Sequence, residues 1–478
     1  MRDFIRKRWG YIVCAAGFFI CCGILSPINS YGRLFTAIQT DLNTTTVQSG
    51  WIGSISWANS FFFSPLAVAI ERCIGHRLTV VLGCTLASCC YLVTSLMTTY
   101  IGVLAFLGII CGTALCFSIH AMMCVLFKAF ADSGRQSMAM SIALVGASVG
   151  TIFLSLTYEK IVPIIGWRQT LQLSSAFCAI LSIPASFLVT ARNETSTKST
   201  ETTTAVIDEK QESHKNEDRP ISSISDKVDR NIVDQSAVDT TKVRDKHWLR
   251  LIVLWRAWFI FFAMSFPAMS WSVYWVNSIS YFESISASAD DILVYVTIMT
   301  VSDFLAKLSV IIVPRGTLNE VNALILSDVV GVFITLLFVL WPAKPVLIVC
   351  CVYIGIGRAL YNILPFKATV DLLDVANPEQ GITLGMFALG VGFAVGTVPA
   401  GAIYDISGSY SVAFIINSVF FSIGGGFLMI LKSCKPRWRR RRESRHSVHK
   451  SQTLCQNIHG RRTSSDSHGV DNQIEIKC

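Results

Sequence analysis

The amino-acid sequence predicts an all-α polytopic membrane protein with twelve transmembrane helices in two six-helix halves. Of its 478 residues, 52% are hydrophobic and only 15% are charged, whereas soluble globular domains carry roughly 25% charged residues. The mean hydropathy is +0.53, and the charged residues gather in a few polar stretches between long apolar runs. A chain of this composition has to be solvated by lipid, which excludes a set of soluble domains.

Twelve apolar segments each approach the roughly 20 residues that a helix needs to cross a bilayer. Six of them form a predicted N-terminal half at residues 1–190. They run from Trp9 to Tyr31, Val47 to Ile70, Leu78 to Leu96, Tyr100 to Phe127, Ser137 to Tyr158 and Thr170 to Val189. Six more form a C-terminal half at residues 248–431. They run from Trp248 to Trp275, Ile292 to Val313, Val321 to Trp341, Val346 to Val370, Ile382 to Tyr404 and Ser411 to Leu431.

Two polar segments complete the chain. Residues 191–247 mix Lys, Glu, Asp, Ser and Thr with almost no aromatic residues, which is typical of a disordered cytosolic linker. Residues 432–478 form a basic cytosolic tail that contains an arginine-rich run from Arg437 to Arg442. This run satisfies the positive-inside rule, and specific binding of lipid or of a partner is the alternative. The formal charge of +9 therefore indicates topology and attraction to membrane lipid, with no nucleic acid as a partner.

The positions of lysine and arginine predict the orientation of the helices. These residues collect in alternate short loops, and basic residues in short loops mark the cytoplasmic side. The loops in question contain Arg6, Lys7 and Arg8, Arg72 and Arg77, Arg135, and Arg315. We therefore expect an integral membrane protein, in the plasma membrane, with both termini cytoplasmic.

Motifs that carry enzyme chemistry are missing from the sequence. It contains no glycine-rich phosphate loop between a strand and a helix and no HExxH. Its GxSxG stretch, Gly146 to Gly150, lies inside an apolar predicted helix and not at the strand-to-helix turn of a nucleophile elbow. Most of the 16 cysteines lie inside apolar runs, without the Cys/His spacing of a metal site. The sequence thus predicts no enzyme, no metal site and no cofactor.

Charged side chains inside the predicted helices are the main functional signal, because each costs about 2.5–3.5 kcal/mol near the bilayer centre. Asp303 and Lys307 are four residues apart and so share one helical face. Arg358 lies at a comparable depth in another helix, directly after Gly355 and Gly357, which permit close approach of a backbone or ligand. If all three groups face one cavity, one positive charge is in excess and an anion can bind. The alternative is a structural ion pair between helices.

Protons enter this hypothesis through Asp303. Its protonation would free Lys307, so that a proton and an anion would favour each other's binding. His120 could relay protons or form a hydrogen bond with a neighbouring helix, and we interpret it, with Arg33, as gating or structural. Gly146 and Gly150 are four residues apart, which predicts close helix packing.

Several short motifs resemble one family. Trp9-Gly10-Tyr11 begins the first predicted helix, Gly75-His76-Arg77 follows the second, and Gly166-Trp167-Arg168 precedes the sixth. The longest match is Gly396 to Tyr410, with the sequence GTVPAGAIYDISGSY. Together with twelve spans in two halves, these motifs resemble the monocarboxylate transporter family of the major facilitator superfamily.

The resemblance implies roles for particular residues. Members of this family carry an aspartate on the eighth helix and, four residues later, an arginine that grips the substrate carboxylate. Asp303 and Lys307 occupy these positions, and lysine lacks the planar bidentate fork of arginine. Phe366 stands where the family places an aromatic side chain along the substrate path, and Asn29 replaces a lysine of the proton-coupled members. Arg135 is what remains of a basic cluster, with a gating or structural role.

The predicted function is secondary-active or facilitative transport of small monocarboxylates or related organic acids by alternating access, with or without proton symport. Substrate binding is assigned to Lys307, Arg358, Phe366 and Asn29, and proton coupling to Asp303. One alternative is pH-independent uniport of aromatic or zwitterionic substrates, and another is a receptor or scaffold that does not transport. The resemblance also implies a single-pass glycoprotein as a partner.

Overall fold

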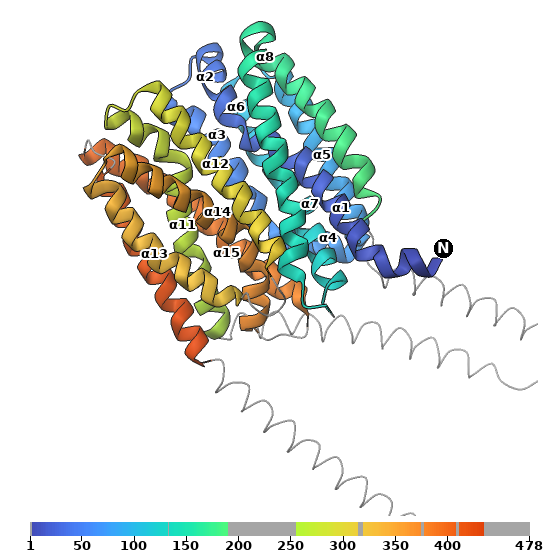
Figure 1. The fold of residues 1–478 in the computed structure, drawn as a ribbon. Coiled ribbons are helices and arrows are strands. Elements are labelled where there is room, and N and C mark those ends of the chain that lie inside the picture. The colour runs from blue at the N-terminus through green and yellow to red at the C-terminus, as the bar shows by residue number, and fades with distance from the viewer. Residues whose placement is uncertain are drawn as a thin grey trace, which may run out of the picture. The chain divides into compact units, whose positions relative to one another are not determined.

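The computed structural model describes residues 2–131, 133–189, 255–313, 319–373, 377–407 and 411–434, and all regular structure within these ranges is helical (Figure 1). Five features predicted from the sequence lie outside these residues. They are the linker at residues 191–247, the start of the seventh predicted span at residues 248–254, the loop residue Arg315, the basic run from Arg437 to Arg442, and the end of the longest family motif at residues 408–410. The domain boundaries drawn at the linker and the tail therefore stay predictions.

The described residues before residue 190 form nine helices. They are α1 (Arg2–Asn29), α2 (Tyr31–Leu42), α3 (Thr46–Phe62), α4 (Ser64–Ile74), α5 (His76–Leu96), α6 (Tyr100–Val103), the π-helix η1 (Leu104–Ile110), α7 (Cys111–Ala129) and α8 (Gln136–Ser186). After residue 254 follow α11 (Trp255–Ser284), α12 (Ala289–Ile312), α13 (Glu320–Leu340), α14 (Lys344–Leu373) and α15 (Pro378–Ser407). A last helical segment spans Ser411–Cys434.

Ten helical segments among the described residues are long and apolar enough to cross a membrane. The predicted number of twelve agrees with this once two local features are considered. The 51-residue α8 covers two predicted spans, and Gly166, with φ 82°, forms the break between them. The predicted span from Val47 to Ile70 is divided at Phe63 between α3 and α4, with Pro65 in the first turn of α4. The predicted fold class is therefore confirmed.

Small residues let the helices pack at backbone distance. α1 lies along α8, where a Cβ atom added to Gly146 would be 2.0 Å from the carbonyl oxygen of Phe18. α12 lies along α14, where a Cβ on Gly355 would be 2.3 Å from the carbonyl oxygen of Met299. The prediction of close packing at Gly146 is thus confirmed, and the approach of α14 to α12 brings Arg358 near the charged pair on α12.

Several helix contacts join the helices before residue 190 to those after residue 254. The largest are those of α15 with α3 and of α12 with α8, and smaller ones join α15 to α4 and α7 and α14 to α8. At the first contact, a Cβ on Gly390 would be 2.3 Å from the backbone nitrogen of Phe62. The polar side chains of the candidate site lie along these contacts.

Substitution of Gly146 tests the packing. We expect Gly146→Ala to lower the free energy of unfolding by at least about 1–3 kcal/mol, because its methyl group would overlap the backbone of α1. The matched control is Gly426→Ala, because nothing lies within 4 Å of a Cβ at Gly426. Thermal unfolding of the purified protein in detergent measures both, and equal midpoints for the two variants would contradict the packing argument.

Candidate functional site

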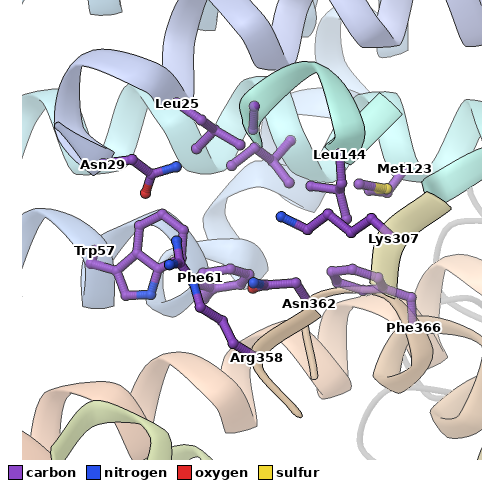
Figure 2. Close-up of a pocket in the computed structure, with 12 residues that line it drawn as sticks. Leu25, Asn29, Trp57, Phe61, Met123, Leu144, Lys307, Arg358, Asn362 and Phe366 are labelled. Atoms are coloured by element: carbon purple, nitrogen blue, oxygen red, sulfur yellow. The ribbon is translucent and has the colours of Figure 1, made fainter. Parts of the chain in front are cut away.

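A central cavity lies between helices from both parts of the chain (Figure 2). The four side chains predicted to bind substrate, Asn29, Lys307, Arg358 and Phe366, all line it. Its other lining residues come from α1, α3, α7, α8 and α14, and they are Leu25, Trp57, Phe61, Ile119, Met123, Leu144, Ala147 and Asn362. The structure thus brings these four residues together, although their roles stay predictions.

Asp303 lies beside the cavity and holds Lys307 through a buried ion pair. The amino group of Lys307 is 2.8 Å from Oδ2 of Asp303. Ser148 on α8 completes a triangle, because its hydroxyl donates to the same Oδ2 at 2.9 Å and accepts from Lys307 at 2.8 Å. Asp303 and Lys307 are 2% and 4% exposed. The pair therefore links α12 to α8, as well as presenting a cation to the cavity.

Arg358 is the second cation that faces the cavity. Its guanidinium lies 3.6 Å from the centre of the Trp275 ring, and Trp275 stacks on Trp57 across the contact between the two parts of the chain. Within the described ranges, no carboxylate forms an ion pair with Arg358. A cation that is held by an aromatic face alone retains its hydrogen-bond donors for an incoming anion.

Asn29 and Phe366 have different surroundings. The side-chain nitrogen of Asn29 donates to the hydroxyl of Thr151 at 3.3 Å, and its oxygen is buried without a hydrogen-bond partner among the described residues. Phe366 is 1% exposed and packs as part of the wall. A buried amide oxygen without a partner favours a ligand that brings a donor.

Three residues that line the cavity were not predicted from the sequence, although helical spacing could have indicated them. Asn362 lies between Arg358 and Phe366 at steps of four residues, so all three share one face of α14. Trp57 and Phe61 are also four residues apart, on α3. Their signal in the sequence is weak, because aromatic residues at this spacing are common on any buried helix face.

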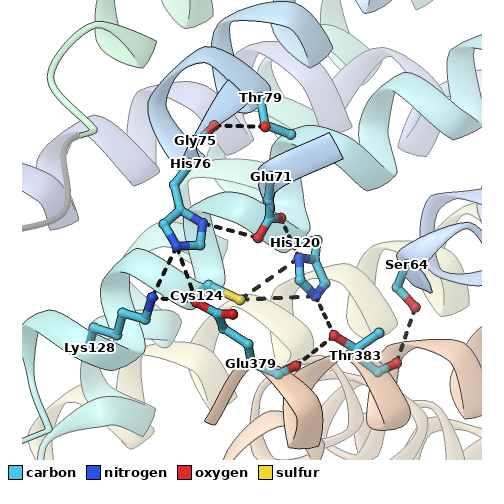
Figure 3. A network of polar contacts seen from close by, with 10 residues as sticks. All are labelled: Ser64, Glu71, Gly75, His76, Thr79, His120, Cys124, Lys128, Glu379 and Thr383. Carbon is cyan, nitrogen blue, oxygen red and sulfur yellow. Dashed lines mark hydrogen bonds and ion pairs between the residues drawn. The ribbon is translucent and has the colours of Figure 1, made fainter. Parts of the chain in front are cut away.

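A second group of polar side chains joins α4, α5, α7 and α15 at one end of these helices (Figure 3). We call its titratable members, Glu71, His76, His120, Lys128 and Glu379, the charged cluster. Lys128 forms an ion pair with Glu379 and lies 3.0 Å from Nε2 of His76. Nδ1 of His76 is 3.0 Å from Oε2 of Glu71. The cluster thus connects the last turns of α4 and α7 to the first turn of α15.

His120 lies at the buried edge of the charged cluster. Its Nδ1 is 2.5 Å from Oε1 of Glu71, and its Nε2 is 2.9 Å from the hydroxyl of Thr383 on α15. The sequence suggested a single intramembrane histidine, but the fold supplies partners from two other helices. Glu71 and Glu379 were missed because each lies near a predicted helix end, where acidic residues are ordinarily exposed.

Glu71, His120 and Cys124 have donor atoms within 4.8 Å of one another, and we tested whether they fit a metal ion. Two ligands of a tetrahedral zinc ion lie about 3.3 Å apart, since each bond is about 2.0–2.1 Å long. The 2.5 Å between Nδ1 of His120 and Oε1 of Glu71 is too short for that geometry. This distance fits a shared proton instead, so we assign no metal to the group.

A third polar contact lies near the start of α8. The hydroxyl of Ser137 donates to Glu320 on α13 at 2.8 Å, and Lys367 on α14 is 2.6 Å from the same Oε1. Arg135 is the exposed residue before α8 and does not line the cavity. Arg33 belongs to α2, but its side chain lies outside the described residues. The gating or structural roles predicted for both stay predictions.

Comparisons with known proteins agree with this fold. A family model described as Major Facilitator Superfamily matches residues 9–387, which is most of the chain. Among solved structures, the E. coli fucose:proton symporter FucP is 13% identical with a TM-score of 0.58, covering 88% of this chain and 98% of that chain. The proton:xylose symporter XylE is 10% identical with a TM-score of 0.63, covering 88% and 96%. The chain belongs to the major facilitator superfamily, whose members are transporters and not enzymes.

Curated relatives show which members of this superfamily the chain is similar to. Monocarboxylate transporter 13 of Rattus norvegicus is 20% identical over 425 residues, which cover 88% of this chain and 89% of the relative. Monocarboxylate transporter 12 of Homo sapiens is 21% identical over 455 residues, covering 89% and 81%. Monocarboxylate transporter 7 of Homo sapiens is 28% identical over 163 residues, covering 34% and 31%. The resemblance to monocarboxylate transporters is thus confirmed across both groups of helices.

A double-mutant cycle tests the buried ion pair. We expect Lys307→Met to lower the free energy of unfolding by about 3–5 kcal/mol, because it leaves the carboxylate of Asp303 buried without its cation. The double variant Asp303→Asn with Lys307→Met removes both charges and should recover most of this loss. Thermal unfolding in detergent measures the cycle.

The matched control is Lys344→Met, because Lys344 forms an exposed ion pair with Asp291 between the same two helices, α14 and α12. This variant should change stability little. A cycle in which the two effects simply add would show that Asp303 and Lys307 are not coupled.

Proposed function

We propose that this protein is a secondary carrier that moves small monocarboxylates or related organic acids across a membrane by alternating access. The observation that carries the proposal is the presence of two cations, Lys307 and Arg358, on the wall of one central cavity. Asp303 balances only one of them. The cavity therefore has an excess positive charge that a substrate carboxylate would neutralise.

The rest of the wall supports an acid with an apolar body. Trp57, Phe61 and Phe366 present aromatic surface beside the two cations. A carboxylate bound between Lys307 and Arg358 would place the remainder of the substrate against these rings. Lys307 binds as a point charge, so selectivity for the carboxylate geometry falls mainly to the planar guanidinium of Arg358.

Alternating access requires contacts that break at one end of the protein while the cavity opens. The charged cluster and the contact of Ser137 with Glu320 join the two groups of helices at one end. These contacts are hydrogen bonds and ion pairs, which can exchange partners or be replaced by water more readily than interlocked apolar side chains. We propose that they form the gate at the end predicted to be cytoplasmic.

Proton coupling is a finer part of the proposal. Both Lys307 and Ser148 contact Oδ2 of Asp303, and these contacts stabilise the ionised carboxylate. Asp303 would then act on transport by holding or releasing Lys307 as substrate arrives. We also propose that both termini are cytoplasmic, from the loop charges. A plasma-membrane location and a single-pass glycoprotein partner are proposed from the family relationship.

One observation favours a second candidate. The stacked rings of Trp57 and Trp275 and the ring of Phe366 would also accept an aromatic or zwitterionic substrate in pH-independent uniport. Uptake that ignores pH and is inhibited by aromatic amino acids would favour it. For the receptor or scaffold alternative, deletion of the residues after Lys432 discriminates, because a carrier should keep its transport per molecule at the surface.

Uptake into liposomes that contain the purified protein tests the first proposal. We expect uptake of labelled lactate or pyruvate under an inward proton gradient, and Arg358→Gln should raise KM by about tenfold or more, since a charged hydrogen bond contributes about 1.5–3 kcal/mol. Lys307→Arg should retain uptake, because it keeps the charge.

The matched control for Arg358→Gln is Lys344→Gln, which removes an exposed cation from the same helix, away from the cavity lining. Its KM should equal that of the unaltered protein. Failure of all tested acids to enter the liposomes would refute the substrate class, whereas uptake without pH dependence would refute only the coupling.

A further inference from the structure

Hydrogen bonds determine which nitrogen of His120 carries a proton. The hydroxyl of Thr383 donates to the backbone oxygen of Glu379 at 2.6 Å. Its oxygen can therefore only accept from Nε2 of His120, which lies 2.9 Å away. Nε2 is thus the protonated nitrogen that holds α7 to α15, and Nδ1 is left to face Glu71.

One further proton must lie between His120 and Glu71. Nδ1 of His120 and Oε1 of Glu71 are 2.5 Å apart, and two unprotonated acceptors would repel each other at that distance. The His120 side chain is fully buried and that of Glu71 is 3% exposed, so water cannot relieve this repulsion. The pair is neutral overall with the shared proton, and it has a buried negative charge without it.

The groups around the pair offer the proton a route to solvent. Side-chain exposure rises from 3% at Glu71 to 11% at His76, 25% at Glu379 and 40% at Lys128. His76 on α5 contacts Oε2 of Glu71, and it also contacts Glu379 at 3.3 Å and Lys128 at 3.0 Å. A continuous series of titratable side chains therefore connects the buried pair to the surface.

The remaining titratable neighbours of the pair are thiols on α7. Sγ of Cys124 lies 3.8 Å from Nδ1 of His120, and Cys116 is an electrostatic neighbour of Glu71. Both cysteines are buried. Neither thiol occupies the short gap between the imidazole and the carboxylate.

We propose that Glu71 and His120 form a proton-binding site whose occupancy holds α15 against α4 and α7. This inference rests on the geometry of the two side chains and of Thr383. Loss of the shared proton drives His120 and Glu71 apart, and movement of the ring breaks the contact of Nε2 with Thr383. This end of the helices then opens more readily as pH rises.

Hydrogen–deuterium exchange of the purified full-length protein, without substrate, tests the site. We expect backbone amides near the start of α15 to lose at least about tenfold in protection between about pH 5 and about pH 8, after correction for intrinsic exchange. Glu71→Gln should abolish this pH dependence, because its amide donates to Nδ1 at every pH and so replaces the shared proton.

Two control variants distinguish the effect of Glu71 and His120 from that of other polar groups. His76→Gln removes the nearest other imidazole and should keep the pH dependence. Asp41→Asn breaks the ion pair with Arg168 between α2 and α8 and should also keep the pH dependence.

Thr383→Val should lower protection at low pH, because it removes the acceptor for Nε2 of His120. This last variant also provides a test if Glu71→Gln does not fold.

Protection in the unaltered protein that does not change with pH would overturn the proposal. An unchanged profile in Glu71→Gln, a profile abolished by His76→Gln, or an unaffected Thr383→Val would overturn it as well. The exchange experiment requires no substrate, so its outcome is independent of the uptake assay. If monocarboxylates are taken up but protection does not change with pH, only this site is refuted. If protection changes with pH as expected but no monocarboxylate is taken up, only the proposed substrate class is refuted.

Discussion

The cavity depends on one buried interaction, the triangle of Asp303, Lys307 and Ser148. A buried charge is tolerated only when it is paired and hydrogen-bonded, so each member makes the other two possible. Because Ser148 belongs to α8 and the ion pair to α12, the triangle also determines how the two groups of helices meet at the level of the cavity. Lys307 is consequently held at the wall, where its charge adds to that of Arg358.

The polar contacts between the two groups of helices form two levels with different chemistry. At the cavity, cations are in excess and an anion would complete the balance. At the charged cluster, two acids, Glu71 and Glu379, meet three bases, His76, His120 and Lys128. The first level is suited to bind a charged solute, and the second is suited to respond to protons. Coupling between them requires no direct contact, because both levels connect the same helices and can bias the same two-state rearrangement.

Much of the fold and part of the site could be predicted because the evidence for them is local. Apolar runs of about 20 residues predict spans wherever they pack. The spacing of Asp303 and Lys307 predicts a shared face before any neighbour is known. Glu71 could not be recognised in the same way, because its partner His120 is 49 residues away on α7 and its partner His76 lies beyond the end of α4, on α5. The aromatic support of Arg358 was equally hidden, since Trp275 comes from α11.

By itself, the sequence determined the class of protein, the number of spans and the presence of three intramembrane charges, because hydropathy and helical periodicity act within one segment. Only the tertiary structure decided which charges are neutralised. Asp303 pairs with Lys307 and leaves Arg358 to an aromatic ring, and His120 shares a proton with Glu71 between three helices. The physical reason is that the protonation and charge balance of a buried group depend on every helix that surrounds it, and helix packing brings together residues that are far apart in the chain.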